Sequence, residues 1–410
     1  MDIFSVLNYQ GSKKNILDFI HSNTKDMINE DSTILDIFSG TCSVGYSFKA
    51  NHCVYANDCE PFAYVIANAL LNSNYISFDV IKDEFISNYT ENFNNQQGLY
   101  LELSKEEKKL LDDKNSKALV EFYKSIPTVW NSKQLLTNNH KCFELFTTYY
   151  SASYFGVFQA IEIDSIRFAI EQFKRESIYF ALLTTLFFSM KECVFSKDGH
   201  MAQPLSLEKN EERMIKQRSK SVYSIFLSKI KEFNSNSFVN SNKDNRVYNM
   251  NFSDLLSEPD IKENVSFIYA DPPYTDMQYS RYYHLLNTVT NYNYPELTIN
   301  NGSYTKGLYT NNRFQSKLST KSNCLNTLSE LLDFSKSYKK DLAISFAYPI
   351  DIKTQKTNRY VMDVNDLILK CNDVFGNKKV DVVTKNYFHS NNRNSKPKNV
   401  NEYLILCKSF

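Results

Sequence analysis

A short apolar run that begins at Val265 ends in Tyr269-Ala270-Asp271-Pro272-Pro273-Tyr274. A run of this length, rich in aromatic and β-branched residues and stopped by proline, predicts a buried strand. Two consecutive prolines then force the chain out of the sheet in an extended conformation. The turn therefore places a carboxylate, a carbonyl and an aromatic ring at the carboxyl end of a strand. In open α/β sheets this is the edge where ligands bind.

These groups suit the methylation of an exocyclic amino group. The amino nitrogen of adenine is a poor nucleophile because its lone pair is drawn into the ring. The Asp271 carboxylate and the Pro272 carbonyl, accepting its two hydrogens, would localise that lone pair toward an incoming methyl group. The Tyr274 ring would stack on the base, as aromatic side chains do on unstacked bases. An ordinary proline turn after a strand is the alternative, and the upstream sequence decides between the two.

The second strong pattern lies near the N-terminus. Residues 33–38 predict a strand, and Ser39 to Gly45 form a loop of small residues that enters a helix. A glycine-bearing loop between a strand and a helix N-terminus can cradle a nucleotide, because its backbone approaches the ligand closely. Residues 52–57 predict the next strand, which ends in Asp58, where such folds carry a ribose-binding acid. Residues 61–71 then predict a helix.

Composition limits the class of protein. The 410 residues are 42% hydrophobic and 14% aromatic, which is ample for a packed core, and the net charge of +1 means that any DNA-binding surface must be a local patch. The 8 cysteines include no C-x-x-C pair, so we expect neither a zinc site nor a disulfide framework. Reduced thiols and the lack of a recognisable signal peptide favour a cytoplasmic protein. The apolar run of residues 178–190 is too short to span a bilayer.

The middle of the chain differs from its ends. Residues 78–240 carry charged and aromatic segments with helical periodicity, including a basic helix at 210–233. Strand patterns return at 246–249, 342–347, 380–388 and 403–407. A polar stretch at 275–322 interleaves tyrosines with arginines and lysines, as suits a nucleic-acid groove. We therefore expect a core built from residues 1–77 and 241–410, with residues 78–240 as an inserted target-recognition region.

In order and spacing these motifs resemble the DPPY-type DNA adenine (N6) methyltransferases, which use S-adenosylmethionine. The resemblance covers roughly residues 8–71 and 246–407. It implies an α/β fold, with a Rossmann-like sheet of seven mostly parallel strands, helices on both faces and an inserted, mainly helical DNA-recognition domain. It departs from the family pattern at Cys42, which stands where the first cofactor motif usually has its second glycine. A side chain there would be penalised at a positive φ.

The resemblance also implies roles for individual residues. An N-terminal motif would lie against the methionine end of the cofactor, a second motif would form the cofactor loop, and two acids would bind the ribose and the adenine amine. The cofactor-binding residues are then Tyr9, Gly11, Lys13, Asp36, Phe38, Gly40, Asp58 and Asp254, and the catalytic residues are Asp271, Pro272, Pro273 and Tyr274.

Several alternatives stay open at this point. Asp36 could cap a turn, Glu60 could replace Asp58 as the ribose acid, and Asp254 could be a helix N-cap. We expect His200 and His284 to have structural rather than catalytic roles, because the amino proton can leave to solvent.

The function implied is that of a site-specific DNA adenine N6-methyltransferase acting on double-stranded DNA, with the target base flipped out of the helix. Such an enzyme would serve a restriction–modification system, beside a separately encoded endonuclease, or a phage or epigenetic process. It would need no metal and no membrane. The alternatives are methylation of cytosine N4 or of RNA, or a catalytically silent DNA-binding specificity subunit.

Overall fold

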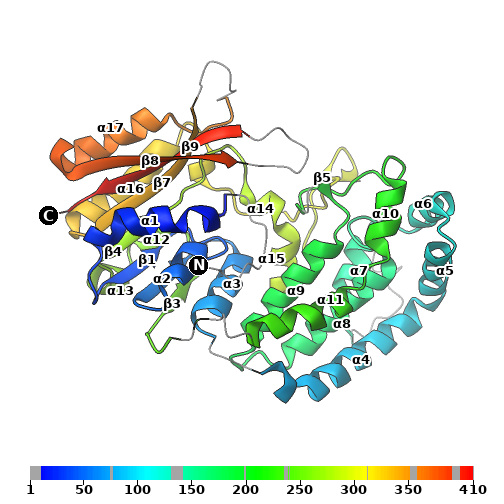
Figure 1. Ribbon diagram of the computed structural model, residues 1–410. Helices are drawn as coiled ribbons and strands as arrows, with labels where there is room; N and C mark the ends of the chain where they lie inside the picture. The colour runs from blue at the N-terminus through cyan, green and yellow to red at the C-terminus, as the bar shows by residue number, and fades with distance from the viewer. Residues whose placement is uncertain are drawn as a thin grey trace. The chain divides into compact units, whose positions relative to one another are not determined.

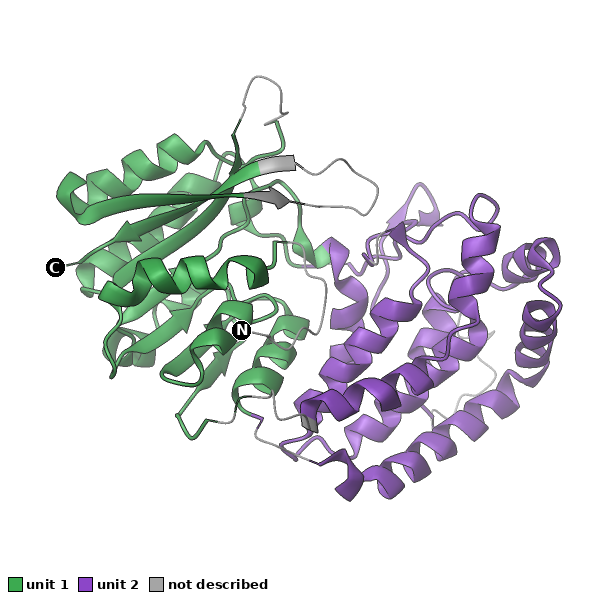
Figure 2. Ribbon diagram, in the orientation of Figure 1, with its two compact units in different colours: residues 1–72, 239–280, 314–410 green, residues 73–238, 281–313 purple. Residues whose placement is uncertain are grey.

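The computed structural model describes residues 11–73, 77–130, 142–197, 200–234, 239, 241–311, 313–350, 358–389 and 398–409. The chain forms two compact units (Figure 2). The first unit contains residues 1–72, 239–280 and 314–410, and the second contains residues 73–238 and 281–313. The short helix α14 (Tyr279–Tyr282) holds the point at which the chain passes from the first unit to the second.

The first unit is built on one sheet. Within the described residues seven strands pair in the order β3-β2-β1-β4-β7-β9-β8 (Figure 1). The five strands from β3 to β7 are parallel, and β9 runs antiparallel to both β7 and β8. The predicted seven-stranded, mostly parallel sheet is therefore confirmed. The strands are β1 (Thr33–Asp36), β2 (Cys53–Asn57), β3 (Arg246–Tyr248), β4 (Phe267–Ala270), β7 (Asp341–Pro349), β8 (Val380–His389) and β9 (Lys398–Cys407).

Helices cover both faces of this sheet. The connection from β1 to β2 runs toward one edge of the sheet, and the connection from β4 to β7 runs toward the other edge. Because such connections are right-handed, their helices lie on opposite faces of the sheet. This explains why β4 is buried along its whole length and reads as a continuous apolar run. The helices of the first unit are α1 (Leu17–Thr24), α2 (Ser43–Phe48), α3 (Pro61–Leu71), α12 (Phe252–Leu255), α13 (Pro259–Asn264), α16 (Cys324–Ser337) and α17 (Val364–Phe375).

The strand order reverses between β1 and β4, and that reversal positions the site. Asp36, the last residue of β1, is paired in register with Tyr269 of β4. The loop after β1 and the Asp271 turn after β4 therefore leave the sheet side by side at its carboxyl edge. This is the topological switch point at which such folds bind ligands.

The second unit is mainly helical. Three buried carboxylates bind the amides that open its helices: Glu107 accepts hydrogen bonds from Val157 and Phe158, Glu162 from Val222, and Asp164 from Phe146 and Thr147. Its helices are α4 (Lys82–Leu99), α5 (Leu101–Asp112), α6 (Ser116–Ser125), α7 (Leu145–Tyr150), α8 (Val157–Glu171), α9 (Tyr179–Cys193), α10 (Glu211–Arg218), α11 (Val222–Lys229) and α15 (His284–Asn291), and a hairpin pairs β5 (Ile299–Asn300) with β6 (Ser303–Tyr304).

His284 belongs to the packed interior of the second unit. Its Nε2 lies 3.3 Å from the Tyr154 hydroxyl, and burial lowers the pKa of the imidazole to about 3. A histidine that stays neutral throughout the physiological range and is enclosed by aromatic rings fits a structural role. Among the described helices of the whole chain, none combines the length and apolar character needed to cross a membrane.

Candidate active site

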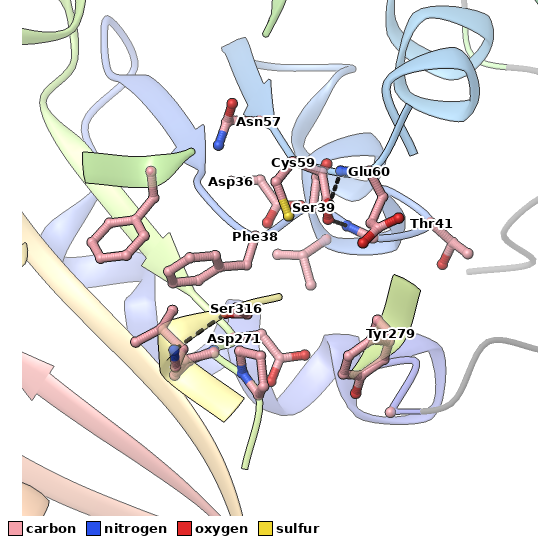
Figure 3. Close-up of a pocket in the computed structure, with 18 of the residues that line it drawn as sticks. Asp36, Phe38, Ser39, Thr41, Asn57, Cys59, Glu60, Asp271, Tyr279 and Ser316 are labelled. Atoms are coloured by element: carbon pink, nitrogen blue, oxygen red, sulfur yellow. Dashed lines mark hydrogen bonds between the residues drawn. The ribbon is translucent and has the colours of Figure 1, made fainter. Parts of the chain in front are cut away.

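A cavity opens at the carboxyl edge of β1, β2 and β4, and all the described residues that line it belong to the first unit (Figure 3). Its empty space, including the part open to solvent, is about 1000 Å³. The residues of the predicted site that line it are Gly11, Lys13, Asp36, Phe38, Gly40, Asp58, Asp271, Pro272, Pro273 and Tyr274.

The two remaining residues of the predicted site have different outcomes. Tyr9 lies outside the described residues. Asp254 is exposed on α12 and is not among the described residues that line the cavity. Its neighbours Asn251 and Phe252 do line it, so α12 faces the cavity with its N-terminal end rather than with this carboxylate.

Asp58 shapes the cavity because its carboxylate accepts hydrogen bonds from two backbone amides. One of its carboxylate oxygens accepts a hydrogen bond from the Gly40 amide at 2.9 Å, and the other accepts one from the Glu60 amide at 2.9 Å. Gly40 has a φ of 52°, which a glycine adopts without steric cost. Burial raises the pKa of Asp58, and these two amide bonds oppose that rise. The carboxylate thus ties the end of β2 to the loop after β1, and the buried Glu60 adds another acid to the cavity wall.

Asp36 holds the helix that follows the loop. Its Oδ2 accepts a hydrogen bond from the Gly45 amide at 2.9 Å, in the first turn of α2. Burial raises the pKa of Asp36 to about 7, and the nearby carboxylates of Asp271 and Asp58 add to the rise. Asp36 therefore does cap a turn, and it also lines the cavity. The two interpretations of this residue are compatible.

Cys42 occupies the left-handed conformation that a glycine would take more easily. Its φ is 55° and its side chain is fully buried. A Cβ added to Gly45 would lie 3.1 Å from the Cys42 sulfur and 3.3 Å from Asp36 Oδ2. The thiol therefore fills the space beside Gly45, and the two positions complement each other.

This complementarity predicts coupling between substitutions at the two positions. We expect Gly45→Ala to be tolerated better in a Cys42→Gly background than in the wild type, by about 1 kcal/mol of unfolding free energy. The gain in helix propensity from alanine is the same in both backgrounds, so the difference isolates the contact with the thiol. Denaturant unfolding of the four proteins measures it. An equal effect of Gly45→Ala in both backgrounds would rule the contact out.

The turn after β4 carries an ion cluster that the sequence did not reveal. Lys13 Nζ lies 3.0 Å from Asp271 Oδ1 and 3.0 Å from Glu402 Oε1. The Glu402 side chain is fully buried, that of Lys13 is 3% exposed and that of Asp271 is 20% exposed. Burial raises the pKa of Asp271 to about 7; Lys13 opposes the rise, whereas Glu402 adds to it.

Two aromatic rings pack against the Tyr274 ring. Its ring stacks on Tyr360 with centroids 6.1 Å apart and meets the edge of Phe346 at 6.3 Å. The Val361 amide donates to the Tyr274 carbonyl at 3.2 Å, which fixes the backbone of the turn. Tyr274 is 8% exposed, so only the side of the ring that borders the cavity is open to a ligand.

Other residues of the cavity wall were not predicted as part of the cofactor or catalytic site, although Tyr279 and Phe314 were predicted to belong to a nucleic-acid groove. Tyr279, Phe314 and Ser316 line the cavity, and the Ser316 amide donates to Gln278 Oε1 at 2.8 Å. All of them lie in the stretch of interleaved rings and cations at 275–322. That pattern was the available signal, although it did not distinguish these residues from their neighbours.

Comparison with known proteins agrees with this geometry. A family model described as D12 class N6 adenine-specific DNA methyltransferase matches residues 9–341. The chain is 28% identical over 299 residues to modification methylase LlaI of Lactococcus lactis subsp. lactis, and 26% identical over 299 residues to type II methyltransferase M.FokI of Planomicrobium okeanokoites. These alignments cover 71% of this chain but only 39% and 38% of the two relatives. Type II methyltransferase M.NlaIII of Neisseria lactamica is 24% identical over 304 residues, which are 70% of each chain.

Proposed function

We propose that this chain, which belongs to the D12 class N6 adenine-specific DNA methyltransferase family, transfers a methyl group from S-adenosylmethionine to the N6 amino group of adenine in double-stranded DNA. The observation that carries the proposal is the shared cavity: the Asp271-Pro272-Pro273-Tyr274 turn after β4 and the glycine-bearing loop after β1 line one space. The names of the relatives support a place in a restriction–modification system. We propose a separately encoded endonuclease as the partner in that system.

The residues of the cavity fit the cofactor. Asp58 and Glu60 provide carboxylates for ribose hydroxyls, and Phe38, Met250 and Phe252 provide an apolar wall for the adenine ring. The loop at Gly40 lets backbone approach the ligand closely. When bound, S-adenosylmethionine would supply a methyl group on a sulfonium centre, which activates that group for transfer to the acceptor nitrogen.

Asp271 and Pro272 prepare the acceptor. The Asp271 carboxylate and the Pro272 carbonyl accept the two hydrogens of the amino group, so the nitrogen lone pair is freed from the ring and directed away from them. The ion pair of Lys13 with Asp271 Oδ1 leaves Oδ2 as the oxygen that meets the amino group. The Tyr274 ring supports the base, and the amino proton leaves to solvent after transfer.

The target adenine has to leave the DNA helix before it can enter the cavity. An adenine amino group cannot be reached within the stack, so we propose that the target nucleotide is flipped into the cavity. We propose the helical unit, residues 73–238 and 281–313, as the part that reads the target. Arg281 and Arg313 lie over the Tyr309 ring at 5.1 Å and 5.7 Å, and such preorganised guanidinium groups suit phosphate or base contacts.

The raised pKa of Asp271 predicts a loss of activity on the acid side. Only the ionised carboxylate accepts the amino hydrogens, and its ionised fraction falls as the pH falls through about 7. We expect kcat for DNA methylation to fall progressively below neutral pH, with an inflection well above the ordinary pKa of an aspartate. A pH–rate profile, run alongside circular dichroism to verify folding, measures this. A rate that stays constant from pH 8 to pH 5 would contradict it.

Transfer of labelled methyl groups tests the proposed function. We expect label from S-adenosylmethionine to enter unmethylated double-stranded DNA, and not RNA or DNA that the enzyme has already methylated to completion. Protein that binds the cofactor but labels RNA alone, or labels nothing, would overturn the proposal.

A further inference from the structure

Glu402 is a buried acid on a strand that carries no recognised motif. It lies in β9, paired in register with Ala347 of β7 and Lys385 of β8, among the apolar residues Leu404, Ile405 and Leu406 that follow it. Its side chain has no exposed surface. An ionised group in such a place is costly unless it is paired, so its partner indicates why it is there.

Lys13 is that partner, and it also binds the carboxylate at the centre of the proposed reaction. Its Nζ lies 3.0 Å from Glu402 Oε1 and 3.0 Å from Asp271 Oδ1. The three residues come from distant parts of the chain: the segment before the first helical turn, the turn after β4, and β9. Lys13 and Asp271 line the cavity, whereas Glu402 is not among the described residues that do.

We propose that Glu402 is a positioning residue, which anchors Lys13 and through it fixes the orientation and the charge of the Asp271 carboxylate. The inference rests on the proposed role of Asp271 as the acceptor for the amino hydrogens. A lysine anchored on a rigid antiparallel strand holds Oδ1 at one place, and Oδ2 then points to one place in the cavity. Catalytic groups need this precision, because misplacement by about 1 Å can cost a hundredfold in rate.

The second carboxylate also sets the charge of the cluster. A buried lysine paired with Asp271 alone would neutralise it and make it a weak acceptor. Glu402 shares the lysine, so the positive charge of Lys13 is divided between two carboxylates. Among the described residues, the Asp271 carboxylate also raises the pKa of Asp36 of β1 and of Tyr269 of β4. Glu402 and Lys13 therefore shift the pKa of Asp271 in opposite directions.

The signs of these effects make the inference testable without substrate. In protein labelled with ¹³C at the aspartate carboxyl carbon, Asp271 can be titrated by NMR and its signal assigned with Asp271→Asn. We expect Glu402→Gln to lower the pKa of Asp271 by about one unit, and Lys13→Met to raise it. The control is Glu263→Gln, an exposed residue of α13 with the same change of charge, which should leave the titration unchanged.

An unchanged Asp271 titration in Glu402→Gln would overturn the inference. An unchanged Asp271 titration in Lys13→Met would overturn it as well, because Glu402 is proposed to act through Lys13. A merely structural Glu402 would lower thermal stability without moving the titration. These readouts do not depend on methyl transfer, so failure of the wild type to methylate DNA would refute the proposed function separately.

Kinetics with DNA provide a second readout. We expect Glu402→Gln to lower kcat about tenfold, to change KM for S-adenosylmethionine little, and to move the acid limb of the pH–rate profile to lower pH. Glu402→Asp keeps the charge and should restore the wild-type acid limb. A fall in kcat with the acid limb unmoved in Glu402→Gln would contradict a role through Asp271.

Discussion

Asp271→Ala should lower the rate of methyl transfer to DNA by about a hundredfold to a thousandfold, which is the size of effect seen when a preorganised hydrogen-bonding group of an active site is removed. The alanine variant keeps the Pro272 carbonyl but loses the carboxylate, so the amino nitrogen retains its conjugation with the ring. Affinity for S-adenosylmethionine should change little, because the loop after β1 and the Asp58 carboxylate remain in place. Single-turnover kinetics and calorimetric titration with cofactor measure the two quantities.

The matched control is Asp373→Ala, which removes an exposed carboxylate from α17 in the same unit. It should behave as the wild type in both measurements. If Asp271→Ala kept a rate within about tenfold of the wild type, the carboxylate would contribute no more than an ordinary contact, and the proposed mechanism would be wrong.

Asp58→Ala has the second large expected effect, on cofactor affinity rather than on the chemical step. Its two carboxylate oxygens accept the Gly40 and Glu60 amides at 2.9 Å, and hydrogen bonds to charged groups contribute about 1.5–3 kcal/mol each. Without them the loop after β1 is no longer tied to the end of β2. We expect the dissociation constant for S-adenosylmethionine to rise about tenfold to a hundredfold.

An analogue of the cofactor that lacks the ribose hydroxyls separates two roles of Asp58. If Asp58 acts by holding the loop, Asp58→Ala should weaken the analogue and S-adenosylmethionine by the same factor. If it acts by binding ribose, only S-adenosylmethionine should be weakened. Unchanged affinity for both ligands would show that neither role is correct.

The sequence predicted the parts of the molecule that depend on local pattern and on the geometry of parallel sheets. The apolar run ending at Ala270 is β4, and residues 33–36 are β1. Because parallel strands end at one edge, the loop after Asp36 and the turn at Asp271 had to meet there, although they are far apart in the chain. The helical pattern of the middle region follows from periodicity in the same way.

What escaped prediction depends on long-range register. Glu402 reaches Lys13 only because β9 pairs antiparallel with β7, which no pattern within residues 398–407 specifies. Asp254 was predicted to lie at the site but does not line the cavity. The side of α12 on which it lies is decided by the packing of Phe252 and Leu255 into the core. The left-handed conformation of Cys42 likewise shows that a buried thiol can occupy a position where glycine is usual.

Nucleoside analysis of DNA methylated by the wild type and by Asp271→Ala in parallel tests the central claim most directly. We predict that the wild type places labelled methyl groups in N6-methyladenine, and that Asp271→Ala, which binds S-adenosylmethionine with nearly wild-type affinity, places almost none. Label in N4-methylcytosine, or label in adenine that does not depend on Asp271, would contradict the proposed acceptor or the proposed role of the carboxylate.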